Sequence, residues 1–275
     1  MLSLRLLFVP ILLLSHTTAM ACSCAKSGFE ERLQKADFVY LGKIVSNRLV
    51  GQGQVRNKLD MIETYKGVPR TLELSSESGN FDACRRLTFV GLNYLVFGKT
   101  GETPSFTPCT DTVEIYSDKD WQLDFLRRRA GAWDKKKDDV YKRSAPTRKY
   151  DKCSRPAYLA RAEQADYVYH GEIIEGNLGR DGIVSSRIRV IEKFKSSPDA
   201  PMMNSDSGDF YVNNLFAATG FRYVVFGKKG TTPDFSICSD TEPLYEVSDS
   251  LRKILKDTFR VTKDIPQTSS REPPR

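Results

Sequence analysis

Histidine is nearly absent from this sequence, with two in 275 residues, at His16 and His170. We expect His170 to lie on the surface of a strand rather than to act as a catalytic base. The sequence also lacks a Ser-His-Asp set, a phosphate-binding loop and a cluster of metal ligands, and the spacing of its carboxylates marks no acid–base pair. We therefore expect that the protein is not an enzyme and holds no cofactor of its own.

Long apolar runs are absent after Leu14, so no membrane span is expected beyond that residue. The run from Leu6 to Leu14 follows Arg5 and precedes the small-residue motif Ala19-Met20-Ala21. A basic residue, an apolar run and an A-x-A motif in this order are typical of a secretory signal peptide, here cleaved before Cys22. We expect residues 1–21 to be removed and the mature protein to be secreted and extracellular.

Removal of residues 1–21 leaves 254 of the 275 residues, enough for one large domain or two of ordinary size. The six cysteines of an exported chain predict disulfide bonds rather than thiol chemistry. The net charge of +7 is concentrated in basic clusters between residues 127 and 149. Such a stretch indicates either sulfated glycans or extracellular matrix as partners, or a solvated linker. Nucleic acid is not expected, because no stacking-platform or zinc-finger motif is present.

The chain matches itself when it is shifted by 129 residues. Ten of the sixteen positions from Tyr94 to Cys109 are identical to those from Tyr223 to Cys238. The same offset, without a gap, aligns Ala36–Tyr40 with Ala165–Tyr169. Agreement at one fixed offset over so much of the chain predicts two copies of one domain.

Both copies have the same expected layout. We place the first repeat at residues 22–130 and the divergent second repeat at 151–260, with a basic linker at 131–150 and a disordered tail at 261–275. Cleavage of the linker by trypsin is expected to release two folded halves. Short strands between two helices in about 110 residues favour a small barrel, with a sandwich as the alternative. The expected fold class is all-β with flanking helices, arranged as two tandem OB-fold-like five-stranded β-barrels.

Local patterns predict the individual elements. Ser27-x-x-Glu30 predicts a capping box at the first helix, and Gly98 to Gly101 predicts a hairpin turn. Alternating apolar residues predict strands at 38–44, 58–65, 167–173 and 186–194. The second helix of each repeat is expected to bury Trp121, Phe125 and Leu126, or Leu251, Ile254 and Leu255.

The duplication also predicts the disulfide pairing. Cys24 and Cys109 have counterparts in the second repeat at the same offset, whereas Cys22 and Cys84 have none. Two cysteines whose counterparts are both missing from the second repeat are expected to be bonded to each other. Among the connectivities that the cysteines allow, we therefore expect Cys22–Cys84, Cys24–Cys109 and Cys153–Cys238, with no free thiol.

Several of these features together resemble the tissue inhibitors of metalloproteinases (TIMPs). They are Cys-x-Cys at the mature N-terminus, Ala36–Tyr40, Tyr65-Lys66-Gly67 and two later cysteines. The resemblance covers the netrin-like inhibitory domain of that family once in residues 22–130 and again, more weakly, in 151–260. It implies a five-stranded OB-type barrel. The pairing derived above agrees with how the family joins its first two cysteines.

The resemblance implies a specific site. In TIMPs, the α-amino nitrogen and carbonyl oxygen of the first cysteine chelate the catalytic zinc of the protease and displace its activating water. Cys22 would take this role toward the zinc of a partner metalloproteinase, and Ser23 would point into the specificity pocket. The inhibitory wedge would consist of Cys22, Ser23, Cys24, Asp82, Ala83 and Cys84.

The chain departs from the family in two respects. Gln34 stands where the third cysteine of the domain usually lies, and the second repeat replaces the cysteine-rich C-terminal domain. The main alternative is a non-inhibitory netrin-like module that binds extracellular matrix, glycans or a receptor. An inhibitor needs the free amine of Cys22, and such a module does not. A bacterial lipoprotein acylated at Cys22 is a third alternative, which Met20 fits poorly.

Overall fold

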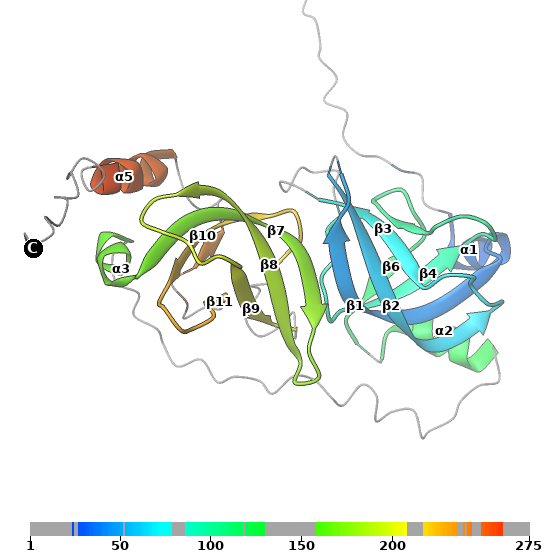
Figure 1. Cartoon of the computed structure of the whole chain (residues 1–275). Helices are drawn as coiled ribbons and strands as arrows, with labels where there is room; N and C mark the ends of the chain where they lie inside the picture. Colours follow the sequence, from blue (N-terminus) through cyan, green and yellow to red (C-terminus); the bar gives the residue numbers. More distant parts are fainter. Residues whose placement is uncertain are drawn as a thin grey trace, which may run out of the picture.

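The two repeats contain the same elements in the same order (Figure 1). The computed structural model describes residues 24, 27–51, 53–78, 86–117, 119–129, 158–207, 217–235, 239, 241–243 and 249–260. The first repeat contains α1 (Phe29–Lys35), β1 (Phe38–Leu49), β2 (Gln54–Lys66), β3 (Glu73–Glu77), β4 (Asn93–Gly98), β5 (Ser105–Phe106), β6 (Val113–Ile115) and α2 (Trp121–Arg129). The second contains α3 (Tyr158–Gln164), β7 (Tyr167–Leu178), β8 (Ile183–Lys193), β9 (Met202–Asp206), β10 (Arg222–Gly227), β11 (Asp234–Phe235), β12 (Glu242–Pro243) and α5 (Asp249–Arg260). The structure thus repeats the duplication that the sequence predicts.

The strands of the described ranges form one mixed sheet. In the first repeat the pairing order is β6–β4–β1–β2–β3–β5, and in the second it is β12–β10–β7–β8–β9–β11. The β3–β5 and β9–β11 pairs are parallel, and the others are antiparallel. No ladder between described residues joins the two ends of either order, so each repeat is a curved, open sheet there. The fold is all-β with flanking helices.

The two repeats are joined through strands β1 and β7, which pair antiparallel. The paired residues are Ser46 with Asn177, Asn47 with Gly176, and Arg48 with Glu175. Figure 1 shows the long β1–β2 and β7–β8 hairpins next to each other at the centre of the molecule. The linker at 131–150 lies outside the described residues. The pairing of β1 with β7 argues against the expectation of two separable halves, because the halves share a continuous sheet.

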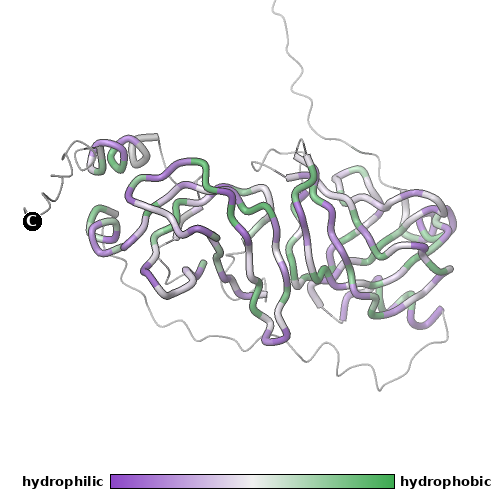
Figure 2. Tube along the Cα trace, in the orientation of Figure 1, coloured by the Kyte–Doolittle hydropathy of each residue, from purple (hydrophilic) through white to green (hydrophobic). Residues whose placement is uncertain are grey.

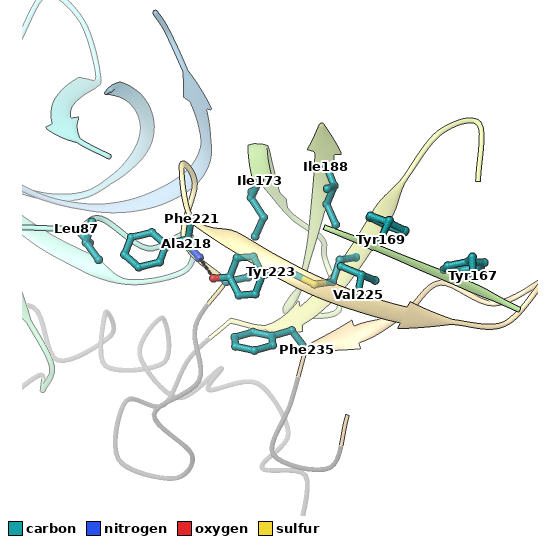
Figure 3. Close-up of a cluster of buried hydrophobic side chains, with 12 residues drawn as sticks. Leu87, Tyr167, Tyr169, Ile173, Ile188, Ala218, Phe221, Tyr223, Val225 and Phe235 are labelled. Atoms are coloured by element: carbon teal, nitrogen blue, oxygen red, sulfur yellow. Dashed lines mark hydrogen bonds between the residues drawn. The ribbon is translucent and has the colours of Figure 1, made fainter. Parts of the chain in front are cut away.

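Each repeat has hydrophobic clusters on both faces of its sheet. In β1, Phe38 and Tyr40 belong to the cluster inside the curved sheet, while Val39 and Leu41 belong to the cluster under α1 and α2. The alternation of a strand sends successive side chains to opposite faces, so both faces of β1 are buried. Figure 2 shows hydrophobic stretches, in green, in the strands of both repeats. The second repeat divides its residues in the same way, and Figure 3 shows its inner cluster.

A lysine at equivalent positions of the two repeats, Lys66 and Lys195, has a structural explanation. The Lys66 ammonium donates hydrogen bonds to the carbonyl oxygens of Leu33, at 3.0 Å, and Gln34, at 3.1 Å, and also to that of Ala36. Lys195 makes the equivalent contacts at the end of α3. A cation at a helix C-terminus satisfies carbonyl groups that lack helical partners. The lysine shared by Tyr65-Lys66-Gly67 and Phe194-Lys195-Ser196 therefore has a structural role.

The helix predictions need correction at their ends. Gly28, not Ser27, is the N-cap of α1, and no side chain caps the helix, because the helix begins at Phe29. Trp121 is 59% exposed, and Leu123 is buried in its place. In α5, Leu255 is buried as predicted, but Ile254 is 45% exposed. The side chain of Leu251 lies outside the described residues.

Two strand predictions are also wrong. The turn after Gly98 does not form a hairpin, because β4 pairs with β1 and β6 whereas β5 pairs with β3. His170 is only 1% exposed rather than on a strand surface. Its strand, β7, is covered on both faces, so strand alternation provides no solvent-facing position there. The predicted strands themselves are present, and β1 continues to Leu49.

Candidate functional site

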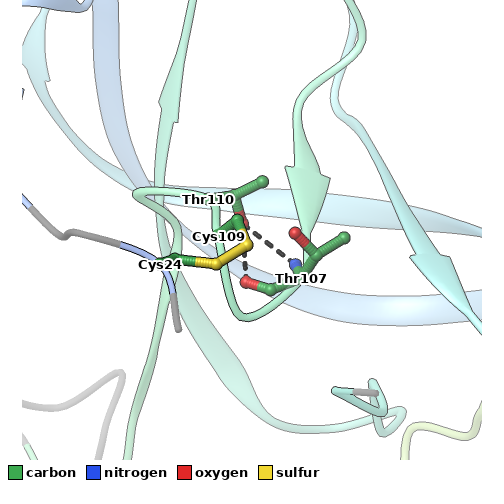
Figure 4. Close-up of a disulfide and its surroundings, with 4 residues drawn as sticks. All are labelled: Cys24, Thr107, Cys109 and Thr110. Atoms are coloured by element: carbon green, nitrogen blue, oxygen red, sulfur yellow. Dashed lines mark hydrogen bonds between the residues drawn. A yellow bond between two sulfur atoms is a disulfide. The ribbon is translucent and has the colours of Figure 1, made fainter. Parts of the chain in front are cut away.

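The N-terminal segment is attached to the first repeat by a disulfide between Cys24 and Cys109 (Figure 4). The two Cα atoms are 5.1 Å apart, and 85 residues separate the cysteines in sequence. This is one of the three pairs that the duplication predicts. The predicted cleavage site lies two residues before Cys24. The bond therefore attaches the chain to the segment that contains Cys109 shortly after the predicted N-terminus.

Cys109 lies in a hydrogen-bonded turn between β5 and β6. The backbone nitrogen of Thr107 donates to the hydroxyl of Thr110 at 2.9 Å, and that hydroxyl donates to the carbonyl oxygen of Thr107 at 3.0 Å (Figure 4). Helix α1 binds the same turn, because Arg32 donates from Nη1 to the carbonyl oxygen of Asp111 at 3.0 Å. The disulfide is therefore fixed on a supported turn rather than on a free loop.

The residues that follow Cys84 are attached to the same part of the fold. The guanidinium of Arg86 lies 5.5 Å from the centre of the Phe106 ring, a cation–π contact. Phe106 is 2% exposed and precedes Cys109 by three residues. The next residue, Leu87, is buried in the hydrophobic cluster of the second repeat. Two neighbouring residues that follow Cys84, Arg86 and Leu87, are thus held by contacts with the folded protein.

The segment from Ser105 to Asp111 therefore holds both approaches to the predicted wedge. Three residues span at most about 11 Å, so Phe106, which contacts Arg86, lies within that distance of Cys109, which is bonded to Cys24. The sequence argument identified Cys24 and Cys109 but missed Arg86, Phe106 and Arg32, because no motif marks them. Outside the described residues lie Cys22, Ser23, Asp82, Ala83, Cys84, Cys153 and Cys238.

One carboxylate near these anchors has a perturbed pKa. Burial raises the pKa of Glu114, which lies on β6, while the hydrogen bond from Tyr116 and the charge of Arg86 act in the opposite direction. The hydroxyl of Tyr116 donates to Oε2 of Glu114 at 2.5 Å. On the neighbouring strand, burial raises the pKa of Tyr94 well above its usual range. The charge of Arg86 therefore acts on a carboxylate that is largely shielded from solvent.

The first residue of the basic stretch, Arg127, is less available for binding a glycan than the sequence indicates. Arg127 makes a bidentate ion pair with Glu63, with Nη2 to Oε1 at 2.7 Å and Nε to Oε2 at 3.1 Å. Its side chain is 11% exposed. Arg128 and Arg129 follow in the last turn of α2, and the clusters after Arg129 lie outside the described residues. Arg127 is thus a structural residue and is not free to bind a glycan.

Within the described ranges, no three His, Cys, Asp or Glu residues lie close enough together to hold a metal ion. No described helix is long and apolar enough to span a membrane. A comparison of the chain with protein-family models and with curated protein sequences finds no match.

Proposed function

We propose that this protein is a secreted inhibitor of zinc metalloproteinases that resembles the TIMP family, with its inhibitory wedge on the first repeat. The α-amino nitrogen and carbonyl oxygen of Cys22 would chelate the catalytic zinc of the protease. Ser23 would enter the adjacent pocket, and Asp82 and Ala83 would contact neighbouring subsites. The protein itself would perform no catalysis and hold no metal.

The observation that best supports this proposal is the convergence of Cys24 and Arg86 on one short segment. Cys22 lies two residues before Cys24, and Cys84 lies two residues before Arg86. The Cys24–Cys109 disulfide and the Arg86–Phe106 contact hold these flanking residues near each other. Cys22 and Cys84 each precede one of these anchored residues by two positions, which supports a Cys22–Cys84 bond. A wedge fixed in this way would lose little conformational entropy on binding.

The chemistry of a mature N-terminal cysteine suits a zinc ligand. Catalytic zinc sites keep an open position for water or substrate, and zinc accepts both nitrogen and oxygen ligands there. An α-amino group has a pKa of about 7.7–8.0, so a metal readily binds its neutral form near neutral pH. The neighbouring carbonyl oxygen would complete a five-membered chelate. This chemistry requires a free amine at Cys22 and therefore cleavage directly before it.

Only the first repeat would inhibit. In the second repeat, Asp151 and Asn213 replace Cys22 and Cys84, and Asp151 has a peptide-bonded nitrogen inside a continuous chain. An amide nitrogen is a poor zinc ligand, and no disulfide would hold the position in place. We further propose that each curved sheet is an OB-fold-like five-stranded barrel, as the resemblance implies.

The proposal is tested with the full-length secreted protein. N-terminal sequencing is expected to begin at Cys22, and titration against a panel of zinc endopeptidases is expected to inhibit at least one of them stoichiometrically. A serine protease of similar substrate range is the control and should keep its activity. A start at another residue would exclude the chelate, and a correct start without inhibition of any panel member would favour a netrin-like binding module.

A further inference from the structure

The second repeat contacts the first at both ends of the segment that carries Cys84. The last described residue before this segment is Ser78, and the first two after it are Arg86 and Leu87. Ser78 is 4% exposed and lies against Gly220 of the second repeat. Leu87 is 8% exposed and belongs to the hydrophobic cluster of the second repeat, next to Phe221 in Figure 3.

The contact at Ser78 leaves no space for a larger residue. Gly220 has a φ of +85°, and a Cβ added there would lie 2.2 Å from the Cβ of Ser78. The reciprocal contact has the same form, because a Cβ on Gly91, with a φ of +94°, would lie 2.5 Å from the Cβ of Ser207. Gly91 and Ser78 correspond to Gly220 and Ser207 at the offset of 129. The two repeats therefore interlock through two equivalent glycine–serine contacts.

Backbone hydrogen bonds connect these contacts to the central strands. The nitrogen of Gly91 donates to the carbonyl oxygen of Ile44 at 2.7 Å, and that of Gly220 donates to Ile173 at 2.7 Å. Ser78 donates from its nitrogen to the carbonyl oxygen of Gly53 at 2.6 Å. A displacement of the second repeat would therefore move Ser78 and Leu87 relative to β1. Close-packed contacts of this kind transmit small shifts instead of absorbing them.

We infer from these contacts that the second repeat is a positioning element for the first: its Gly220 and its hydrophobic cluster fix Ser78 and Leu87, and thereby set the affinity of the Cys84-bearing wedge for the protease. The inference rests on the proposed function and assigns a role to a repeat that lacks the chelating cysteine. Gly220 would act through Ser78 and would not touch the protease.

The test uses Gly220→Ala in the full-length protein, with Gly230→Ala as the matched control. Gly230 has a φ of +78°, so alanine is strained there too, but nothing lies within 4 Å of an added Cβ. The control therefore reproduces the backbone strain without the interface clash. A third variant, Gly220→Ala with Ser78→Gly, removes the clashing Cβ but keeps the backbone strain, so it should return to the behaviour of the Gly230→Ala control.

Two measurements are made on each variant. Hydrogen exchange of the amides in 86–92 needs no protease and should be faster by about tenfold in Gly220→Ala than in the control, which corresponds to about 1.4 kcal/mol of local destabilisation. The inhibition constant should weaken by a similar factor and recover in the double variant. If wild type does not inhibit, the proposed function fails while the exchange data still test the positioning of Leu87.

The outcomes distinguish the positioning of this segment by the second repeat from the effect of that positioning on inhibition. Unchanged exchange in Gly220→Ala would show that the second repeat does not position this segment. Faster exchange with an unchanged inhibition constant would show that the positioning has no effect on the wedge. Equal weakening in Gly230→Ala, or no recovery in the double variant, would assign the effect to general instability and overturn the inference.

Discussion

Asn47 and Gly176, which are equivalent residues of the two repeats, lie opposite each other where β1 pairs with β7. The contact is two-fold symmetric in the backbone but not in the side chains. The hydroxyl of Thr219 donates to Oδ1 of Asn47 at 2.6 Å, and a Cβ on Gly176 would lie 2.8 Å from the same oxygen. The Asn47 side chain thus occupies the space that glycine leaves free. A side chain at Gly176 would compete with that of Asn47 for the same space, so the two repeats are not equivalent at this contact.

Replacement of Gly176 by alanine should destabilise the whole protein. The added Cβ would contact Oδ1 of Asn47 and lie 3.3 Å from Val90, so we expect a loss of about 1–3 kcal/mol, as for overpacked cores. Urea denaturation measures the change. Asn47→Gly alone is the control and completes a double-mutant cycle with Gly176→Ala. Adding Asn47→Gly should recover part of the loss, and a lack of recovery would mean that the clash is not the cause.

Lys66→Met should destabilise the first repeat by removing the ammonium that binds the end of α1. Hydrogen bonds from charged groups are worth about 1.5–3 kcal/mol, and we expect a loss in this range. The thermal midpoint measures it, with exposed Lys58→Met, on the same strand, as the control. Equal midpoints for the two variants would show that the helix end is satisfied by water instead.

Glu114→Gln should stabilise the protein at neutral pH. Because burial raises the pKa of Glu114 in the folded state, ionisation of this group opposes folding at pH values above that pKa. This destabilising effect of ionised Glu114 disappears as the pH falls and the carboxyl is protonated. The variant should therefore have the higher melting temperature at pH 7 and lose this advantage toward pH 4. A constant difference at all pH values, or the same behaviour in exposed Glu102→Gln, would contradict the assignment.

Cleavage of the linker should leave the two repeats associated. Trypsin is expected to cut the basic residues at 131–150, but the β1–β7 pairing and the buried Leu87 connect the halves without the linker. Native size-exclusion chromatography should give one peak that contains both fragments, which separate only under denaturing conditions. Two native peaks would mean that the shared sheet cannot hold the halves together.

The sequence predicts the repeated elements well because the chain encodes them twice, once in each repeat, with the same local pattern. The strands after Ala36 and Ala165 and the pairing of Cys24 with Cys109 follow from that pattern. The burial of His170 could not be predicted, because strand alternation does not reveal that both faces of β7 are covered.

The interface between the repeats was also not predictable from the pattern. Gly91 and Gly220 look like ordinary turn residues, and their role depends on which strand edges meet. Arg86 was missed for a similar reason, since its partner Phe106 is distant in sequence and no local motif connects them. Long-range contacts between unlike side chains leave no periodic signal in a single sequence.

The central claim is that the free amine of Cys22 chelates the zinc of a protease. The most direct measurement compares the inhibition constants of the mature protein and of a form with one alanine added before Cys22. The added residue converts the amine into a peptide nitrogen and shifts Ser23, while the described fold is left intact. The account predicts that inhibition weakens by about 100-fold or more, equivalent to about 2.7 kcal/mol. Equal potency of the two forms would contradict it.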